Sequence, residues 1–341
     1  MYVLLFLLGL WGCIAIYNAT LHNMPFHYLG LQSTWLVIGM FALYLCSKVK
    51  FTLYQKYLIP LAIISYLPMI FVLFWGAKVH GMSGWFKLGD IMMQPSEFAK
   101  TPFILLLSII SVRLTPGKKH FAVLSLLAML WIIPVMLQPD FGTMLVYLSG
   151  FIVVYYISNG NMKMLSLSTL AVVPAIVYVI IKKQYVLDRF SGFLDPMADP
   201  FGMGWHVMQF RYSIANGGFW GRGLGNSVWS NSYLPYSHSD SAFASFCEAV
   251  GFVGAVPVIL GFLFLVYIAY RISRNIECPE RRIFILAIAT LISIQALIHI
   301  SVNLTLLPTT GITLPLFSYG GSSLVSTFIS FGVLLSAARQ D

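Results

Sequence analysis

Long apolar runs alternate with short polar connections along almost the whole chain. A helix that crosses a bilayer needs about 20 mostly apolar residues, and ten segments come close to this length. They cover residues 1–17, 29–47, 57–75, 97–113, 121–137, 142–158, 164–181, 243–270, 283–302 and 317–337. This pattern predicts an all-α polytopic membrane protein. The first run is expected to remain as a span, because it lacks the basic start and the small-residue cleavage site of a signal peptide.

The composition supports a membrane protein. Of the 341 residues, 59% are hydrophobic and 9% are charged, whereas soluble domains carry roughly 25% charged residues. The four cysteines lie in or beside apolar runs or in a basic loop, so the sequence predicts no disulfide framework.

The basic residues gather in alternate connections between the apolar runs. With ten spans and both termini in the cytoplasm, these connections all lie on the cytoplasmic side, where lysine and arginine are enriched. Twelve of the 20 basic residues are placed there: Lys48, Lys50, Lys56, Arg113, Lys118, Lys119, Lys163, Arg271, Arg274, Arg281, Arg282 and Arg339. The net charge of +9 therefore indicates membrane sidedness and not nucleic-acid binding.

This orientation puts two segments on the outer side, residues 76–96 and a long loop over 182–241 between the seventh and eighth spans. A loop of that length in a compact bundle is usually functional. Within it, residues 202–216 are expected to form a helix that lies in the outer interface or packs on the bundle. We expect one integral membrane domain, 1–341.

Asp240 stands where the long outer loop runs into the eighth apolar segment. A carboxylate at the edge of low-dielectric surroundings has a raised proton affinity and can serve as a general base. The alternative is that Asp240 caps the N-terminus of the following helix. The position alone leaves both roles open.

Ionisable side chains inside spans are rare and usually face the interior of the bundle. Glu97 and Lys100 have the i, i+3 spacing of a pair on one helix face, and Asp140 and Glu248 also lie at or within spans. Such groups either neutralise one another and fix the packing, or line an outward-facing cavity for an anionic head group. Pro308 and Pro315 further predict broken helix before the last span.

Four stretches of the sequence resemble the SEDS family of bacterial shape, elongation, division and sporulation proteins, of the FtsW, RodA and SpoVE type. They are residues 84–100, 138–143, 189–240 and 307–323, and they follow one another in the family's order across most of the chain. Residues 198–200, 221–228 and 310–315 favour the division branch, FtsW, whereas the short N-terminus also suits the elongation branch, RodA.

The resemblance implies a peptidoglycan glycosyltransferase that polymerises lipid II, the undecaprenyl-pyrophosphate-linked disaccharide-pentapeptide. Such enzymes work at the outer face of the bacterial cytoplasmic membrane with a class B penicillin-binding protein. The family's essential loop aspartate matches Asp240. Two other functions suit the same features: a lipid II flippase or other transporter, and a non-catalytic scaffold that activates a penicillin-binding protein.

These expectations assign roles to individual residues. Asp240 is expected to be the base, Lys100 and Arg189 to bind anionic groups, and Glu97 to hold Lys100. Further substrate contacts are expected from Trp85, Gln94, Asp140, Gln209, His238, Ser318, Gly320 and Gly321. A divalent cation, Mg²⁺ or Mn²⁺, could bridge Asp240 and the pyrophosphate, but no ligand cluster in the sequence requires one.

The chain departs from the family's usual pattern at several positions. Ser239 and Ser241 flank Asp240 where the family usually has threonine and phenylalanine, and His206 and His299 replace a usual glutamine and a usual asparagine. The aspartate itself is kept. The departures therefore concern the surroundings of the expected base and not the base.

Overall fold

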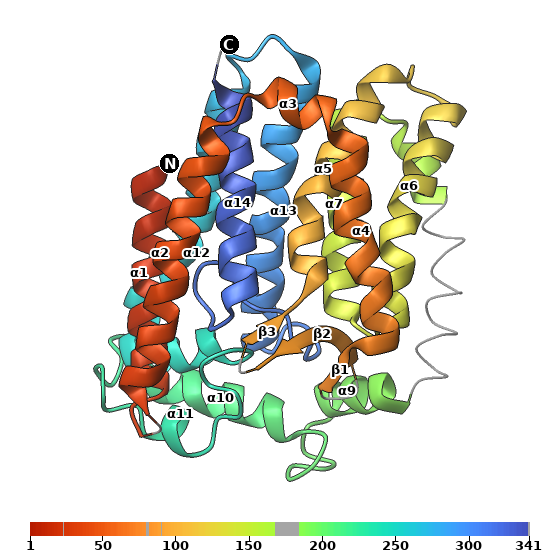
Figure 1. Ribbon diagram of the computed structural model, residues 1–341. Coiled ribbons are helices and arrows are strands. Elements are labelled where there is room, and N and C mark those ends of the chain that lie inside the picture. Colours follow the sequence, from red (N-terminus) through yellow and green to blue (C-terminus); the bar gives the residue numbers. More distant parts are fainter. Residues whose placement is uncertain (23, 80–81, 90, 168–183, 340–341) are drawn as a thin grey trace. The chain divides into compact units, whose positions relative to one another are not determined.

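The computed structural model describes residues 1–22, 24–79, 82–89, 91–167 and 184–339 (Figure 1). Its elements are α1 (Tyr2–Ala19), α2 (Pro25–Lys48), α3 (Phe51–Lys56), α4 (Leu58–Trp75), β1 (Ala77–Val79), β2 (Met82–Leu88), β3 (Ile91–Met93), α5 (Pro95–Arg113), α6 (Lys118–Leu137), α7 (Phe141–Ile157), α9 (Gln184–Leu194), α10 (Trp205–Gly217), α11 (Val228–Ser232), α12 (Ala242–Ser273), α13 (Pro279–Asn303) and α14 (Gly321–Ala338).

The membrane-protein fold class is confirmed. In the part of the chain that the structure describes, 8 helices are long and apolar enough to cross a bilayer: α1, α2, α4, α5, α6, α12, α13 and α14. Helix α7 is apolar but slightly shorter, with 17 residues. The predicted seventh span, 164–181, lies largely outside the described residues, so the total of ten stays a prediction.

The chain forms two compact units, which are described separately. The first comprises Met1–Thr34, Leu167–Leu263 and Gln295–Gly320, and the second comprises Trp35–Ser166, Phe264–Ile294 and Gly321–Asp341. Asp240 belongs to the first unit, and Glu97 and Lys100 belong to the second.

In the first unit, α1 packs against the start of α12 through aromatic rings. The ring centroids of Trp11 and Phe246 are 5.8 Å apart, and those of Phe246 and Phe317 are 5.0 Å apart. Gly12 allows α1 to approach the 304–320 segment, because a Cβ there would lie 2.7 Å from the carbonyl oxygen of Leu316. This packing fixes α1, α12 and the non-helical 304–320 segment to one another.

Helix α10 matches the helix expected over 202–216 and packs within the first unit. Phe210 is buried in a cluster with Leu234, Ala244 and Val302, whereas Tyr212 is exposed. Figure 1 shows α10 and α11, in green and turquoise, at the end of α12 where that helix begins. The structure therefore supports the packed alternative for this helix.

The sequence predicts a continuous span over 243–270, but α12 is interrupted at Gly251, whose φ of 65° is left-handed. The long loop before α12 supplies hydrogen bonds at the interruption. The amide of Arg222 donates to the carbonyl of Glu248 at 2.9 Å, and the amide of Phe252 donates to the carbonyl of Gly218 at 3.0 Å. The break thus depends on contacts between distant parts of the chain, which a hydropathy pattern does not contain.

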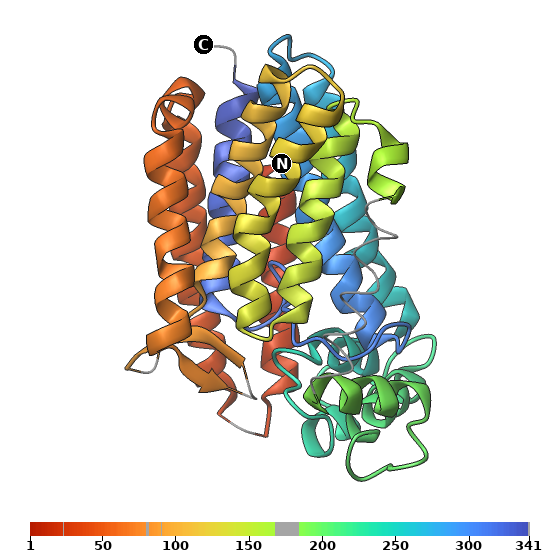
Figure 2. The same ribbon diagram turned by 90° about the vertical axis from the view of Figure 1, so that its right-hand side faces the viewer.

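The second unit contains a small antiparallel sheet in the order β1-β2-β3, which the all-α expectation did not include. Ala77 pairs with Trp85, and Lys87 pairs with Met92. The strands fill the short connection between α4 and α5, and Figure 2 shows them at one end of these helices. Hairpin pairing satisfies the backbone of this connection without further helix.

The core of the second unit surrounds α5. The ring of Phe103 packs on Tyr147 at 4.9 Å and on Trp131 at 5.8 Å between centroids. Gly150 on α7 lies close to Ile104 and Leu291, where a Cβ would come within 3 Å of both side chains. Helix α5 is therefore held on several sides, and its polar N-terminal turn is held with it.

Candidate active site

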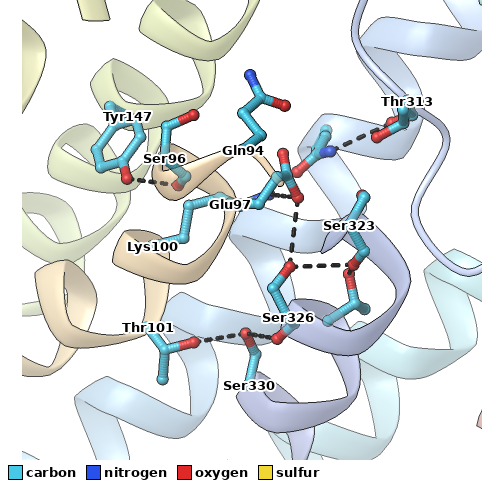
Figure 3. Close-up of polar contacts among 12 residues, drawn as sticks. Gln94, Ser96, Glu97, Lys100, Thr101, Tyr147, Thr313, Ser323, Ser326 and Ser330 are labelled. Atoms are coloured by element: carbon cyan, nitrogen blue, oxygen red, sulfur yellow. Dashed lines mark hydrogen bonds and ion pairs between the residues drawn. The ribbon is translucent and has the colours of Figure 1, made fainter. Parts of the chain in front are cut away.

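The first turns of α5 carry a buried ion pair. The ammonium of Lys100 lies 2.7 Å from Oε2 of Glu97, and the two residues are 5% and 3% exposed. The hydroxyl of Ser326 on α14 donates to the same carboxylate oxygen at 3.4 Å (Figure 3). The pairing predicted from the spacing is confirmed, while the proposed contact of Lys100 with substrate remains a prediction.

Gln94 and Asp140 form a second polar contact in the same unit. Nε2 of Gln94 donates to Oδ2 of Asp140 at 3.0 Å, and the amide of Thr143 donates to Oδ1 at 2.9 Å. Asp140 is thus the N-cap of α7. Its carboxylate fixes the start of α7 to the residue that precedes α5, which is a structural task that the sequence analysis did not assign to it.

Further hydrogen bonds hold the polar turns of α5 in place. The hydroxyl of Tyr147 donates to the carbonyl of Ser96 at 2.7 Å, and the hydroxyls of Thr101 and Ser330 are 2.6 Å apart (Figure 3). Trp85 is half-buried on β2. A Cβ on Gly321 would lie 2.5 Å from the ring of Trp35, so this glycine permits close packing.

In the first unit, the loop that ends in Asp240 is held by its backbone. The carbonyl of His238 accepts from the amide of Tyr319 at 2.8 Å, and the carbonyl of Ser239 accepts from the hydroxyl of Ser318 at 2.9 Å. The carbonyl of Asp240 accepts from Nδ2 of Asn303 at 3.0 Å. Three consecutive carbonyls are therefore fixed, and Asp240 is half-buried at the start of α12.

The cap of α12 involves a residue far away in sequence. Oδ1 of Asn303 accepts from the amide of Ala244 at 2.9 Å, the third residue of the helix and one of the positions that an N-cap side chain normally satisfies. Capping α12 was the alternative role expected of Asp240. At the amide of Ala244, the capping oxygen belongs to Asn303.

An aromatic group lies beside the Asp240 segment. The ring of His238 is 5.0 Å from that of Tyr28 and 5.5 Å from that of Tyr319, between centroids. Burial lowers the pKa of His238, because the charged imidazolium loses its hydration. The imidazole is thus neutral near pH 7 and packs on the two phenol rings.

The remaining predicted residues of the first unit have identified contacts. Nη1 of Arg189 donates to the carbonyl of Thr309 at 2.9 Å, and Oε1 of Gln209 accepts from the indole of Trp229 at 2.8 Å. The hydroxyl of Ser318, besides donating to Ser239, accepts from the amide of Leu314 at 3.0 Å. Gly320 ends the 304–320 segment. Asp240, His238 and Ser318 are brought together, and Arg189 is tied to the same broken segment.

Glu248 is fully buried and organises the long loop before α12. Its carboxylate accepts from the amides of Trp229 at 2.9 Å and Ser230 at 2.7 Å, and from Nδ2 of Asn216 at 2.6 Å. It therefore links α10, α11 and α12. Charge-assisted hydrogen bonds of this kind are strong. The burial of Glu248 is therefore explained by its role in holding α10 and α11 on α12.

Sequence reasoning missed Asn303 and Tyr319 because both act on Asp240 or its neighbours across large sequence separations. Among the described residues, no group of three or more histidine, cysteine, aspartate or glutamate side chains could hold a metal ion. The residues present offer a half-buried carboxylate in one unit and an ion pair in the other. A carboxylate can accept a proton, and cationic side chains can stabilise a leaving anion.

Named proteins from other bacteria are similar to this chain over most of its length. A protein of Halothiobacillus neapolitanus named "probable peptidoglycan glycosyltransferase FtsW" is 34% identical over 97% of this chain and 83% of its own length. A protein of the same name from Trichlorobacter lovleyi is 30% identical over 95% of this chain and 88% of its own length. Both names agree with the division branch that residues 198–200 and 310–315 favour.

Solved structures show the same fold. One, from work on the structural coordination of polymerization and crosslinking by a peptidoglycan synthase complex, matches with a TM-score of 0.82 and 28% identity over 99% of this chain and 97% of that chain. The rod shape determining protein RodA of Thermus thermophilus matches with a TM-score of 0.75 and 25% identity over 99% of this chain and 96% of that chain.

The family model described as cell cycle protein, of the FtsW, RodA and SpoVE type, matches residues 1–341. The match covers both compact units and every stretch in which the sequence resembles the family. This chain therefore belongs to the FtsW, RodA and SpoVE family of cell cycle proteins.

Proposed function

We propose that this chain is a peptidoglycan glycosyltransferase that polymerises lipid II at the outer face of the bacterial cytoplasmic membrane. The observation that carries this proposal is the fixed position of Asp240, whose carbonyl and the two carbonyls before it are each held by a hydrogen bond. The names of the relatives and the match to a peptidoglycan synthase complex support the proposal.

Asp240 acts as the general base. Its carboxylate accepts the proton of the acceptor's 4-hydroxyl while that oxygen attacks the anomeric carbon of the donor. The bond from this carbon to the pyrophosphate breaks, and the lipid pyrophosphate leaves with the electron pair. One displacement inverts the anomeric configuration and needs no covalent intermediate on the protein.

Cationic side chains stabilise the departing pyrophosphate. We assign this role to Arg189, which is half-buried and anchored on Thr309, and to Lys100, which Glu97 orients. The other residues expected to contact substrate are assigned to lipid II: Trp85, Gln94, Asp140, Gln209, His238, Ser318, Gly320 and Gly321.

The chain is expected to act as one integral membrane domain with both termini in the cytoplasm and a class B penicillin-binding protein as its partner. The orientation can be tested with Ser232, which is exposed in the outer loop. In a chain without its native cysteines, Ser232→Cys should react with an impermeant thiol reagent in intact spheroplasts. Protection at this position, together with labelling of Cys278 in a second chain that keeps only this native cysteine, would invert the orientation.

The activity is tested by incubating the purified full-length chain with labelled lipid II, with and without the cognate partner. Glycan strands are expected on a polyacrylamide gel, together with release of one lipid pyrophosphate for each new glycosidic bond. The same preparation in liposomes reports on transport. Absence of glycan under both conditions, with transfer of lipid II across the bilayer, would replace the polymerase by a transporter.

A further inference from the structure

Asn303, the last residue of α13, joins two backbone positions around the start of α12. It is fully buried. Its Nδ2 donates to the carbonyl of Asp240 at 3.0 Å, while its Oδ1 accepts from the amide of Ala244 at 2.9 Å. A single amide group thus fixes the residue assigned as base relative to the first turn of the helix that follows it.

The orientation of this amide is determined by its partners. The amide of Ala244 can only donate, so the oxygen of Asn303 faces it. The carbonyls of Asp240 and His299 can only accept, so the nitrogen of Asn303 faces them, at 3.0 and 3.1 Å. A flipped side chain would place donors against a donor and an acceptor against acceptors, so one orientation is selected.

His299 supports the same orientation. Its Nδ1 lies 2.6 Å from the carbonyl of Ile312, which can only accept, so Nδ1 carries the hydrogen. Its Nε2 is then an acceptor in the neutral ring and lies 3.3 Å from Nδ2 of Asn303. The ring therefore connects the broken 304–320 segment to the amide that contacts Asp240.

We propose that Asn303 is a positioning residue for Asp240. This proposal rests on the assignment of Asp240 as the general base. A base must lie within hydrogen-bond reach of the hydroxyl that it deprotonates, and a misplacement of about 1 Å can lower a rate about 100-fold. Ser318 and Tyr319 hold the two residues before Asp240, whereas Asn303 contacts Asp240 itself.

Asn18 provides a matched control. It is also a fully buried asparagine of the first unit, and its side chain also bridges two partners. Nδ2 donates to the hydroxyl of Ser227 at 3.1 Å, and Oδ1 accepts from the amide of Gly225 at 2.8 Å. Asn18→Ala and Asn303→Ala therefore remove similar hydrogen bonds, but only the second removes a contact with Asp240.

The test measures kcat and KM for lipid II polymerisation by the full chain with its partner, per folded molecule as judged by size-exclusion elution and thermal unfolding. Asn303→Ala is expected to lower kcat about 10- to 100-fold with little change in KM, and Asn18→Ala to leave both constants near the wild-type values. Equal losses of kcat in the two variants would show a structural role and overturn the proposal.

Asn303→Asp separates the two contacts. It keeps an oxygen for the amide of Ala244, and aspartate caps helices about as well as asparagine, but it replaces the donor that faces the carbonyl of Asp240. Positioning predicts a loss of kcat as large as in Asn303→Ala. Wild-type kcat in Asn303→Asp would reduce Asn303 to a helix cap.

Two further variants keep the result interpretable. If Asn303→Asp does not fold, Asn303→Ser replaces it, because the serine oxygen lies near the position of Cγ and reaches neither partner. It should show the same loss of kcat. Asp240→Asn in the same assay separates the two levels of the proposal. If Asp240→Asn is inactive while the Asn303 variants are fully active, the positioning role of Asn303 is wrong and the assignment of the base stands. If Asp240→Asn is active, the assignment of Asp240 as the base is wrong.

Discussion

Different hydrogen bonds fix the acidic residues at the start of α5 and at the start of α12. At α5, the carboxylate of Glu97 is itself engaged, by Lys100 at 2.7 Å and Ser326 at 3.4 Å, and it is 3% exposed. At α12, Asp240 is fixed through its backbone carbonyl by Asn303, and the residue is half-buried.

This difference indicates different tasks. A carboxylate engaged by a lysine and a hydroxyl in a buried site is suited to orient a cation, because removing it would leave that cation unpaired. At the start of α12 a hydrogen bond to the main chain of Asp240 holds the residue in place, as a base that must stay within reach of a hydroxyl requires. We therefore assign orientation to Glu97 and proton transfer to Asp240.

The largest effect on stability is expected from breaking the ion pair. Lys100→Ala leaves Glu97 buried without its cation, which typically costs about 3–5 kcal/mol, and it should also abolish polymerisation. Thermal unfolding in detergent and the glycan assay measure the two effects. Lys163→Ala, at an exposed lysine, is the control and should change neither.

The double variant Glu97→Gln with Lys100→Met sharpens this result. It removes both charges at similar volume, so folding should recover while polymerisation should not. Wild-type polymerisation by the double variant would show that the pair serves packing alone, and it would remove Lys100 from the proposed site.

A more local effect is expected at Glu248, the buried carboxylate that backbone amides hold. Glu248→Ala leaves the amides of Trp229 and Ser230 without their acceptor, and each unsatisfied buried group costs about 1–3 kcal/mol. Limited proteolysis should then cut the long loop before α12 sooner than in the exposed control Glu277→Ala. Unchanged proteolysis would mean that α11 does not depend on Glu248.

The smallest effect concerns the pH dependence of stability at His238. Burial places its pKa below the unfolded value of about 6.5, so the unfolded chain binds this proton more readily. The free energy of unfolding should therefore decrease as the pH drops below about 6.5 towards the pKa of His238 in the folded chain. It should be regained when the pH rises above about 6.5 again. His238→Phe should show a weaker dependence in thermal unfolding between pH 5 and 7, and an identical dependence would contradict the assigned cause.

The sequence predicted the elements that depend on local patterns. The apolar runs located the helices, and the i, i+3 spacing predicted the pair of Glu97 with Lys100, which the structure confirms. The position of Asp240 at the entry to α12 was also predicted. Each of these features is encoded within a few residues or one helix length.

The features that the sequence did not predict arise from distant contacts. Backbone hydrogen bonds join the interruption of α12 at Gly251 to residues 218–223, and Asn303 contacts Asp240 across 63 positions. The substrate contact expected of Asp140 stays a prediction, while its role as the cap of α7 was not predicted. Such contacts appear only when the chain is folded, because no periodicity relates the residues involved.

The most direct test of the central assignment is the rate of lipid II polymerisation by Asp240→Asn. Asparagine keeps the shape of the side chain and caps helices about as well as aspartate, but it has no basicity. The variant should fold, enter the membrane and bind the partner, yet make no glycan, while the control Glu277→Gln polymerises normally. Polymerisation by Asp240→Asn at the wild-type rate would contradict the assignment of Asp240 as the base.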